Sequence, residues 1–293
     1  MKGGAWTVNP PALPSKVQIL HPPPRYPHRM RIVRFSPEGI DPAVGLGSSP
    51  LFGVLDVDNH IAVLSGDPIH DGIKPNGKRV PLEQVRLLAP VIPRSKIVCV
   101  GKNYADHVKE MGAVVPAEPL IFLKPNTSVI GPGDIITWPS MSDRIDYEAE
   151  LAVVISRTCK DVPMDRVNDV IFGYTVANDV TARDLQKLEG HGRGKGFDTF
   201  CPLGPWIDTD FIPGGQAIQA TLNGELVQSG KLTEMIFDIP TIIHFISRVM
   251  TLLPGDVILT GTPAGIGPMS ELSTITVAVE GLGELTNTLS VRG

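Results

Sequence analysis

The sequence predicts a β-rich α+β fold, and three observations carry that prediction. The chain of 293 residues contains 30 glycines and 28 prolines, which imply many turns between short elements. Its apolar residues fall mostly into short runs rich in valine and isoleucine, as in buried strands. Only one segment shows the apolar spacing of a well-formed amphipathic helix. We therefore expect many short strands and few helices.

The composition is that of an ordinary globular chain and argues against several kinds of partner. Hydrophobic residues make up 42% of the chain, and the mean hydropathy is +0.10. The net charge is −5 with no basic block, which disfavours nucleic acid or an anionic membrane. No apolar run reaches the length of a membrane span. Cys99, Cys159 and Cys201 lack CxxC spacing, so we expect reduced thiols in a cytoplasmic protein and no structural zinc.

The first 29 residues differ from the rest of the chain. They hold seven prolines and no apolar core like that of a signal peptide. A strand-like pattern starts only at Met30. We expect residues 1–29 to be a Pro-rich tail, either flexible or draped over the protein, in front of a natural start at Met30.

Residues 30–90 are predicted to form a small β-rich N-terminal domain. Strand candidates lie at 32–35, 51–57 and 61–64, and Asp58-Asn59-His60 is a hairpin turn signal. The polar, Gly/Pro-rich stretch 71–81 is predicted to be a loop. A linker is expected near 88–95. This part of the chain holds no cluster of residues suited to catalysis.

Residues 91–293 are predicted to form the larger domain, again mostly of strands. Strand candidates lie at 96–100, 120–123, 135–138, 148–155, 171–177, 217–222, 257–260 and 275–279. One or two helical turns are expected within 102–112, where Gly112 stops them.

A longer helix is predicted to begin after Asp238, a good N-cap, with Pro240 in its first turn. Its apolar residues recur at i, i+3, i+4 and i+7 as far as Leu253, and the following Pro254-Gly255 is expected to end it. His244 falls on the opposite, polar face, so we expect it at the surface.

Acidic residues at the start of the strand candidate 148–155 are the centre of the functional prediction. Side chains alternate in a strand, so Glu148 and Glu150 point the same way, and Asp146 joins them if the strand begins early. Buried like charges repel, so a proton, a basic side chain or a hard cation must neutralise them. The alternative is a solvated strand end with the acids facing water.

A third candidate ligand, Asp179, follows the apolar run 171–177. An acid at a strand end can also be a helix cap, as can Asp184 nearby. Together, Glu148, Glu150 and Asp179 would offer three oxygen ligands without His or Cys. Such a set suits Mg²⁺, Mn²⁺ or Ca²⁺ and suits zinc or copper poorly.

His107 and Glu110 are three residues apart on the predicted helical turn and therefore share a face. A carboxylate beside an imidazole fixes its tautomer and raises its basicity, which suits a base that activates water. A surface ion pair is the alternative. Their position after a buried strand and a glycine, where active-site loops tend to lie, favours the catalytic interpretation.

Two glycine-rich stretches fail the tests for nucleotide-binding loops. Stretch 190–196 has Glu189 and Gly196 where a P-loop requires glycine and Ser/Thr, which leaves a cationic loop able to bring Lys195 or Arg193 onto an anionic substrate. Stretch 261–267 lacks the GxGxxG spacing. Its backbone N–H groups and the Thr262 hydroxyl could bind a carboxylate, although a structural turn is at least as consistent with it.

Six motifs in order resemble those of the fumarylacetoacetate hydrolase superfamily. They are Gly-Lys-Asn-Tyr-Ala-Asp-His-Val-Lys-Glu-Met at 101–111, Phe-Leu-Lys-Pro at 122–125, Glu-Ala-Glu-Leu at 148–151, Asn-Asp-Val-Thr-Ala-Arg-Asp at 178–184, Lys-Gly-Phe-Asp-Thr-Phe-Cys-Pro at 195–202 and Leu-Thr-Gly-Thr-Pro-Ala-Gly-Ile-Gly at 259–267. Within the superfamily the chain resembles acylpyruvate hydrolases and oxaloacetate decarboxylases, and bacterial hydroxyhepta-dienedioate or carboxymethyl-hydroxymuconate isomerases. The resemblance covers residues 82–291.

The resemblance implies a mixed β-sandwich that rolls into a barrel, usually as a homodimer. It implies a Mg²⁺ site (or Mn²⁺, with Ca²⁺ possible in crystals) on Glu148, Glu150 and Asp179, whereas Asp146 matches no motif role and is left as a surface or supporting residue. The remaining roles follow the matched positions: a His107–Glu110 dyad, an active-site Lys195, and substrate contacts from Gln186, Thr262, Arg183 and Lys102. Several relatives have Arg in place of Lys102, and Lys cannot reproduce a bidentate guanidinium contact.

We expect a metal-dependent enzyme that acts on 2-oxo or 2,4-dioxo acids through a metal-stabilised enolate. The preferred reaction is C–C bond cleavage, either acylpyruvate hydrolysis or oxaloacetate decarboxylation. The alternative is an isomerase of aromatic catabolism that acts on 2-hydroxyhepta-2,4-diene-1,7-dioate or 5-carboxymethyl-2-hydroxymuconate. A non-catalytic metal- or metabolite-binding protein on the same scaffold is a more remote alternative.

Overall fold

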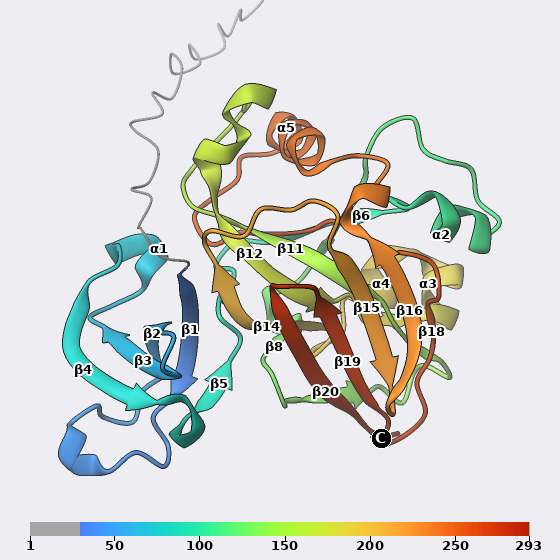
Figure 1. The fold of residues 1–293 in the computed structure, drawn as a ribbon. Coiled ribbons are helices and arrows are strands. Elements are labelled where there is room, and N and C mark those ends of the chain that lie inside the picture. The colour runs from blue at the N-terminus through green and yellow to red at the C-terminus, as the bar shows by residue number, and fades with distance from the viewer. Residues whose placement is uncertain (1–29, 293) are drawn as a thin grey trace, which may run out of the picture.

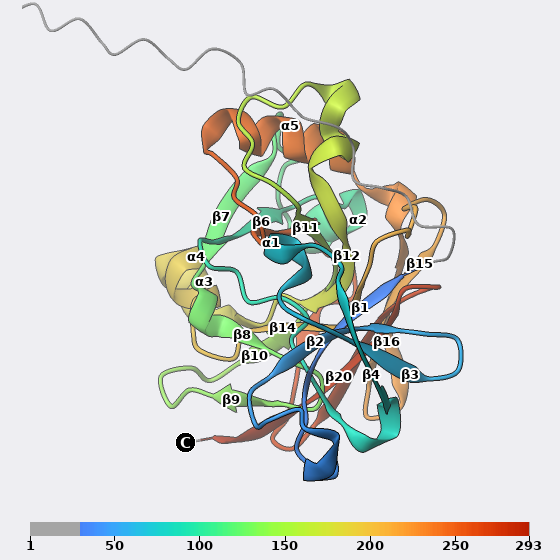
Figure 2. The same ribbon diagram turned by 90° about the vertical axis from the view of Figure 1, so that its left-hand side faces the viewer.

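The computed structural model describes residues 30–292, so the predicted tail at 1–29 lies outside the described residues. Figure 1 shows a small lobe, coloured blue to cyan, beside a larger body that holds the other described residues. Figure 2 turns this lobe toward the viewer. Within residues 30–292, no helix is long and apolar enough to cross a membrane.

The small lobe is a curved sheet around its own apolar core, which includes Val33, Phe35 and Ile61. Its strands and short helices are β1 (Arg31–Ser36), η1 (Pro42–Val44), β2 (Leu51–Leu55), β3 (His60–Leu64), α1 (Pro68–Asp71), β4 (Pro75–Pro81), η2 (Leu82–Gln84) and β5 (Arg86–Leu88). The predicted loop at 71–81 is wrong, because β4 pairs antiparallel with β3. β4 is an exposed edge strand with only Val80 buried, so it lacks the apolar alternation that identifies a strand.

The larger body contains the remaining elements, and β1 joins the lobe to it by pairing with β14. Its elements are β6 (Ile97–Gly101), α2 (Ala105–Glu110), β7 (Leu120–Lys124), η3 (Asn126–Ser128), β8 (Val129–Ile130), β9 (Ile135–Trp138), β10 (Ile145–Tyr147), β11 (Ala149–Ile155), η4 (Met164–Val170), β12 (Ile171–Asn178), β13 (Thr181–Ala182), α3 (Arg183–Glu189), α4 (His191–Lys195), β14 (Cys201–Asp208), β15 (Ala217–Leu222), β16 (Glu225–Lys231), η5 (Leu232–Glu234), α5 (Ile239–Val249), β17 (Val257–Leu259), β18 (Gly267–Pro268), β19 (Thr274–Val279) and β20 (Gly283–Arg292).

Two sheets pack face to face in this body and confirm the β-rich, sandwich-like prediction. A twelve-stranded sheet follows the path β4-β3-β2-β1-β14-β12-β11-β17-β6-β7, with β5 paired to β1 and β8 paired to β14. A five-stranded sheet runs β16-β15-β19-β20-β9. Val153 and Val176 of the first sheet and Val277 of the second share one buried core. Both strand orders are open paths, so the sheets do not close into the barrel that was expected.

Among the strands of the body that have no counterpart in the sequence prediction, the three longest are β14, β16 and β20. β14 contains two prolines and a glycine, which normally argue against a strand. β16 is mostly exposed, and β20 alternates apolar residues with threonine, asparagine and serine. Their backbones are held by pairing with β12, β15 and β19, which is tertiary information that local composition does not contain.

Helix α5 begins as predicted, with the Asp238 carboxylate accepting a hydrogen bond from the Thr241 N–H at 2.9 Å. It ends at Val249, earlier than Pro254, because Leu252 pairs its backbone with Cys159 instead. His244 is half-buried, and its Nδ1 lies 2.7 Å from the Val162 carbonyl. The expectation that His244 is a plain surface residue is therefore wrong.

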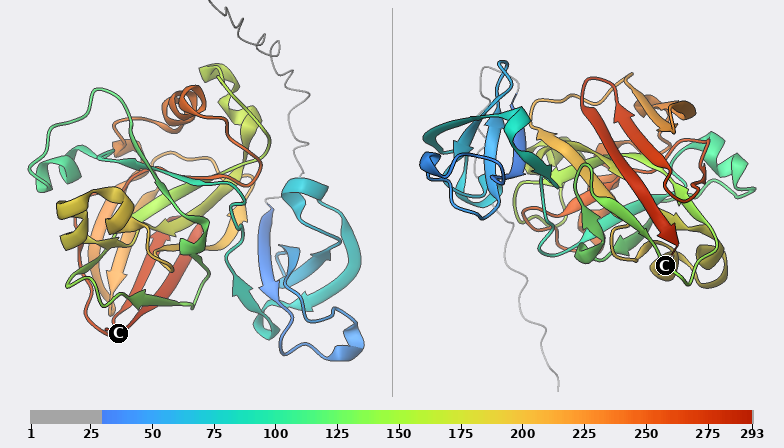
Figure 3. Two further views of the ribbon diagram at one scale, coloured as in Figure 1. Left: turned by 180° about the vertical axis from the view of Figure 1, so that it is seen from behind. Right: turned by 90° about the horizontal axis from the view of Figure 1, so that it is seen from below.

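The short helices α2, α3 and α4 gather at the end of the larger body that lies away from the small lobe (Figures 1 and 3). The strand β7 also reaches this end and contacts α4. These elements carry most of the residues that the sequence analysis singled out. The fold therefore gathers the candidate site at one end of the twelve-stranded sheet.

Candidate active site

The three predicted metal ligands lie together at the junction of β10, β11 and β12. Glu148 sits between β10 and β11, Glu150 lies in β11, and Asp179 directly follows β12. The Asp179 N–H donates to the Glu148 carbonyl at 2.9 Å, which fixes the two backbones side by side. The three residues are only 4%, 2% and 1% exposed, and oxygen atoms from all three lie within 4.8 Å of one another. The alternative of a solvated strand end is wrong.

Two of these carboxylates are neutralised by buried lysines, whereas the third is not. Lys195 Nζ donates to Glu148 at 2.9 Å and to Asp179 at 2.6 Å, and Lys124 Nζ donates to Asp179 at 2.5 Å. Glu150 accepts a hydrogen bond only from the Gly261 N–H, at 2.6 Å, among the contacts of residues 30–292. One buried carboxylate of the cluster thus lacks a cationic partner.

The electrostatics of the pair Glu148 and Glu150 follow from this difference. Burial disfavours the charged form of Glu148, but the charges of Lys195 and Arg183 outweigh it and hold the pKa of Glu148 well below its ordinary value. Burial and the negative charges of Asp179 and Glu148 raise the pKa of Glu150 well above its ordinary value. A hard divalent cation would relieve this repulsion, and an all-carboxylate set is the donor set that Mg²⁺ or Mn²⁺ prefers. The residues fit such an ion.

Lys124 is a site residue that sequence reasoning missed. It is 2% exposed, and besides Asp179 it donates to the Val180 carbonyl at 3.2 Å. Its only signal was membership of the Phe-Leu-Lys-Pro motif, to which no role had been given. A lysine at the end of an apolar strand ordinarily extends its ammonium group to solvent, so its burial could not be read from the strand pattern.

Asp146 and Arg183 form a layer behind the ligands. Asp146 is fully buried and accepts hydrogen bonds from Arg144 Nε and Arg183 Nε, both at 2.8 Å. Arg183 also donates from Nη2 to Glu148 and from Nη1 to Gln186. Asp146 is thus a supporting residue and not a surface residue. Arg183 lines the site, and three of its five N–H donors bind these protein partners.

The His107–Glu110 pair is placed by helix α2. His107 Nδ1 lies 3.1 Å from Glu110 Oε2, and the His107 side chain is 8% exposed. Glu110 Oε1 also accepts a hydrogen bond from the Gly265 N–H at 3.1 Å, which ties α2 to the 261–267 turn. When Nδ1 donates to Glu110, Nε2 is the nitrogen free to accept a proton. The imidazole is buried and lines the site, whereas Glu110 reaches the surface, so the catalytic role of the pair stays a prediction.

A cavity of about 60 Å³ brings nearly all the predicted residues together. The predicted residues that line it are Lys102, His107, Glu148, Glu150, Asp179, Arg183, Gln186, Lys195 and Thr262. Glu110 lies behind His107 and does not line it. Thr262 Oγ1 accepts a hydrogen bond from Gln228 Nε2 at 2.6 Å, so its hydroxyl hydrogen remains available to a bound oxygen.

The glycine-rich turn at 261–267 binds a carboxylate through its backbone, as the sequence suggested, but the carboxylate is that of Glu150. Gly261 has φ +99°, and a side chain there would place its Cβ 2.7 Å from the Asn103 Cβ. Glycine is therefore required at this position. The turn holds a metal ligand in place instead of contacting substrate through the Gly261 N–H.

The cationic loop predicted at 190–196 is mostly the short helix α4. Lys195 at its end points into the acidic cluster, whereas Arg193 pairs with Glu189 on the outside. His191 stacks on Phe122, with ring centroids 4.5 Å apart. Lys102 adopts φ +58° and forms no hydrogen bond or ion pair within residues 30–292, so its ammonium group is available at the cavity.

Two family models match the sequence. One is described as "Fumarylacetoacetate (FAA) hydrolase C-terminal" and matches residues 96–290. The other is described as "Rv2993c-like, N-terminal" and matches residues 30–90.

Curated relatives match over most of their length. Protein Rv2993c of Mycobacterium tuberculosis is 52% identical over 221 residues, which cover 74% of this chain and 83% of that protein. The mitochondrial oxaloacetate tautomerase Fahd2a of Rattus norvegicus is 38% identical over 274 residues, which cover 87% of this chain and 88% of that protein.

Solved structures of similar proteins include two isomerases and a hydrolase. The 2-hydroxyhepta-2,4-diene-1,7-dioate isomerase of Mycobacterium marinum has a TM-score of 0.78 and 43% identity, covering 89% of this chain and 98% of that one. The 5-carboxymethyl-2-hydroxymuconate delta-isomerase of Mycobacterium smegmatis has a TM-score of 0.79 and 43% identity, covering 90% of this chain and 99% of that one. The fumarylpyruvate hydrolase of Pseudomonas aeruginosa, in complex with Mn²⁺ and pyruvate, has a TM-score of 0.65 and 30% identity. The match covers 71% of this chain and 92% of that one.

Proposed function

Because the chain belongs to the fumarylacetoacetate hydrolase family, we propose that it is a divalent-metal-dependent isomerase that moves a proton within the enol form of a small 2-oxo dicarboxylic acid. At the coarser level it is a family enzyme with a buried acidic metal site. The observation that carries the proposal is that His107, which is buried and paired with Glu110, lines the same cavity as this acidic site. A proton acceptor thus lies beside the place where an oxo acid would be held.

The balance of charge supports an anionic, chelating substrate. Four acids and four basic residues form the connected cluster: Asp146, Glu148, Glu150 and Asp179 with Arg144, Arg183, Lys124 and Lys195. With all eight groups ionised their charges cancel, so a divalent ion would leave a surplus of two positive charges. The enolate of a 2-oxo acid carries two negative charges, one on the carboxylate and one on the enolate oxygen. It therefore matches that surplus.

The chain's own residues would divide the work as follows. Glu148, Glu150 and Asp179 would hold the ion, which polarises the 2-oxo group and stabilises negative charge on its oxygen. His107, oriented by Glu110, would take a proton from the carbon next to the oxo group and return it at another atom of the enol. The Thr262 hydroxyl would donate to a substrate oxygen. Lys195 would offset the charge that develops beside Glu148 and Asp179.

The position of Lys102 is an argument for a second carboxylate group in the substrate. It lines the cavity, whereas Arg183 already uses three of its five N–H donors on Asp146, Glu148 and Gln186. An ammonium group that forms no ion pair within residues 30–292 is suited to a distal carboxylate. We therefore assign the substrate to the dicarboxylates instead of the simple 2-oxo acids.

Isomerisation and C–C cleavage share the same enolate, and the relatives favour isomerisation. The sequence alone had ranked cleavage first. The similar proteins named above include two isomerases of unsaturated hydroxy diacids and a tautomerase of oxaloacetate. Hydrolysis remains the second candidate, because a fumarylpyruvate hydrolase is also similar and the same dyad could activate water.

The proposal is tested by following two signals at once on the metal-loaded protein. Oxaloacetate enriched in its enol form, and a muconate-type hydroxy diacid, are supplied with Mg²⁺ or Mn²⁺. Loss of the enol absorbance reports proton transfer, and a coupled lactate dehydrogenase assay reports pyruvate. We expect accelerated loss of the enol without matching pyruvate release. Release of pyruvate at the rate of enol loss would replace isomerisation by C–C cleavage.

We further propose Mg²⁺ or Mn²⁺ as the resident ion and a cytoplasmic homodimer as the working form. The first choice is supported by the all-oxygen donor set and by the Mn²⁺ in the hydrolase of Pseudomonas aeruginosa. Metal analysis of the purified protein tests the ion, and sedimentation equilibrium tests the dimer.

A further inference from the structure

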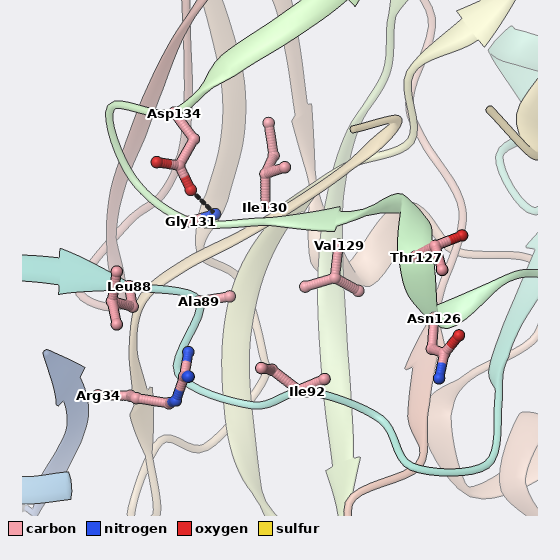
Figure 4. Close-up of a pocket in the computed structure, with 10 residues that line it drawn as sticks. All are labelled: Arg34, Leu88, Ala89, Ile92, Asn126, Thr127, Val129, Ile130, Gly131 and Asp134. Carbon is pink, nitrogen blue, oxygen red and sulfur yellow. Dashed lines mark hydrogen bonds between the residues drawn. The ribbon is translucent and has the colours of Figure 1, made fainter. Parts of the chain in front are cut away.

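A second cavity of this protein lies outside the active site. It measures about 370 Å³ and lies where the small lobe meets the larger body. Its walls come from β1, from the end of β5 and the linker after it, and from the segment η3–β8 with the turn that follows (Figure 4). None of the residues assigned above to metal, base or substrate lines it.

The cationic group that lines this cavity is the guanidinium group of Arg34. Arg34 is half-buried, and its guanidinium group forms no hydrogen bond or ion pair with any residue in the range 30–292. The acid that lines the same cavity, Asp134, is already bound by the Gly131 N–H at 2.8 Å and by Arg86 at 3.2 Å. Burial lowers the pKa of Arg34 and the negative charge of Asp67 only partly opposes that shift, because Asp67 caps helix α1 and pairs with Arg94 at 3.6 Å.

The rest of the lining is mostly apolar, with the Asn126 amide and the Thr127 hydroxyl at the far side. In Figure 4, Arg34 extends from β1 toward the linker, Asn126 lies across the cavity from it, and Ile92 and Val129 lie between them. Leu88 and Ile130 complete the apolar wall. The Asn126 side chain forms no hydrogen bond within the described part of the chain, so its amide is available to a ligand.

The cavity wall is firmly held. A Cβ at Gly131 would lie 2.4 Å from the Ala89 nitrogen, so the β8–β9 turn packs directly on the linker. Asn287 Nδ2 donates to the carbonyls of Gly131 and Asp134, each at 2.9 Å, and fixes the same turn from behind. A cavity with such a wall is preformed, as ligand sites usually are.

We propose that this cavity is a second binding site, specific for a short-chain organic carboxylate. The carboxylate pairs with the Arg34 guanidinium, whose planar donors match two carboxylate oxygens. The apolar chain lies on Ile92, Val129 and Ile130, and the Asn126 amide meets the far end. Inorganic phosphate would satisfy Arg34 but would leave the apolar wall uncovered, so a carboxylate with a hydrocarbon body fits better. The occupant contacts η3, which begins two residues after the active-site Lys124.

The test is calorimetric titration of the metal-loaded full chain with butanoate and, separately, with inorganic phosphate. Butanoate has no 2-oxo group and is therefore a poor chelating ligand for the active site. We expect saturable binding of butanoate that is weakened about tenfold or more by Arg34→Gln, because a charge-assisted pair is lost. Arg31→Gln is the matched control: Arg31 lies on the same strand but stacks on Trp206 away from this cavity, so binding should persist.

A second variant tests the same site if Arg34→Gln unfolds. Ile92 is 49% exposed, so Ile92→Glu is expected to fold, and its carboxylate would compete for Arg34 and abolish butanoate binding. The proposal is overturned if wild type shows no saturable butanoate binding. It is also overturned if folded Arg34→Gln, or Ile92→Glu, binds butanoate like wild type. Weakening of binding by Arg31→Gln as large as that by Arg34→Gln would overturn it too. So would tighter binding of phosphate than of butanoate.

Discussion

Arg183 is held against the metal-ligand cluster by Asp146, whose Oδ2 accepts a hydrogen bond from Arg183 Nε at 2.8 Å. Asp146 is fully buried, and Arg144 grips it from the other side with two hydrogen bonds of 2.8 and 3.1 Å. Arg183 in turn donates to Glu148. The orientation of one metal ligand thus depends on an acid that does not itself lie in the cavity.

Asp146→Asn is expected to weaken metal binding by about tenfold or more, since groups that orient metal ligands commonly carry effects of that size. An asparagine keeps the shape but loses the charge that pairs with two arginines. Calorimetric titration of the metal-free protein with Mn²⁺ measures the effect apart from turnover. Asp143→Asn, at a side chain that is 80% exposed, is the control and should bind Mn²⁺ like wild type. Equal Mn²⁺ affinity in Asp146→Asn and wild type would remove the positioning role.

Lys124→Met is expected to destabilise the metal-free protein by about 3–5 kcal/mol, the usual cost of breaking a buried ion pair. Asp179 would then keep only Lys195 as a cationic partner. Because a divalent ion would neutralise Asp179, the loss should shrink in excess Mg²⁺. Chemical denaturation with EDTA and with Mg²⁺ measures both values.

Lys96→Met is the control for this comparison. Lys96 pairs with buried Asp256 at 2.6 Å, and neither residue lines the candidate active site. The loss of stability caused by Lys96→Met should be the same with EDTA and with Mg²⁺. A loss at Lys124 that does not depend on metal would show that Lys124 is only a structural partner.

Strand periodicity, which is a local property, predicted part of the ligand cluster, whereas the metal role of its three residues followed from the resemblance of the motifs. Glu148, Glu150 and the end of β12 were placed by apolar runs and alternation alone. The burial of Lys124 was not accessible, since a lysine at a strand end does not reveal what lies beyond it. The same limit applies to Asp146, whose burial depends on two arginines that approach it from Arg144 and from the start of α3.

Elements whose position is determined by side-chain patterns were predicted correctly. Elements whose position is determined by backbone pairing with other strands were missed. Helix α5 has a capping residue and an apolar stripe, and its start was correct. Its end was set by the pairing of Leu252 with Cys159, which no local signal announces. Strand β14 contains Pro202 and Pro205, so its place between β1 and β12 had to come from the neighbouring strands.

His191→Gln is expected to make stability less sensitive to acid. Burial and the neighbouring Lys195 lower the pKa of His191 in the folded protein. Between its folded and unfolded pKa values the unfolded chain binds more protons, so stability falls as the pH drops below the ordinary histidine range. Glutamine cannot titrate, so thermal unfolding of the variant should change less between neutral pH and pH of about 5. An unchanged pH slope would mean that His191 does not contribute to it.

Glu148→Ala and Asp179→Asn are each expected to abolish metal-dependent turnover in a protein that still folds. Each removes a carboxylate from a set that has no histidine or cysteine to replace it. Mn²⁺ binding by calorimetry and folding by circular dichroism are measured on the same samples. Glu118→Gln, in an exposed loop, is the control and should retain activity. Full turnover in either ligand variant would sink the metal assignment.

His107→Gln separates proton transfer from binding. Loss of a general base typically lowers kcat by about 100- to 10,000-fold, and glutamine cannot take up the proton. Glu110→Gln should lower kcat less, because the imidazole remains and loses only the carboxylate that orients it. Metal-dependent binding of pyruvate, measured by calorimetry, should change little in either variant, since the carboxylate cluster is intact. Lys109→Gln, on the exposed side of the same helix, is the control for α2. Equal loss of kcat and of pyruvate binding in His107→Gln would make His107 a binding residue and leave the proton to another group.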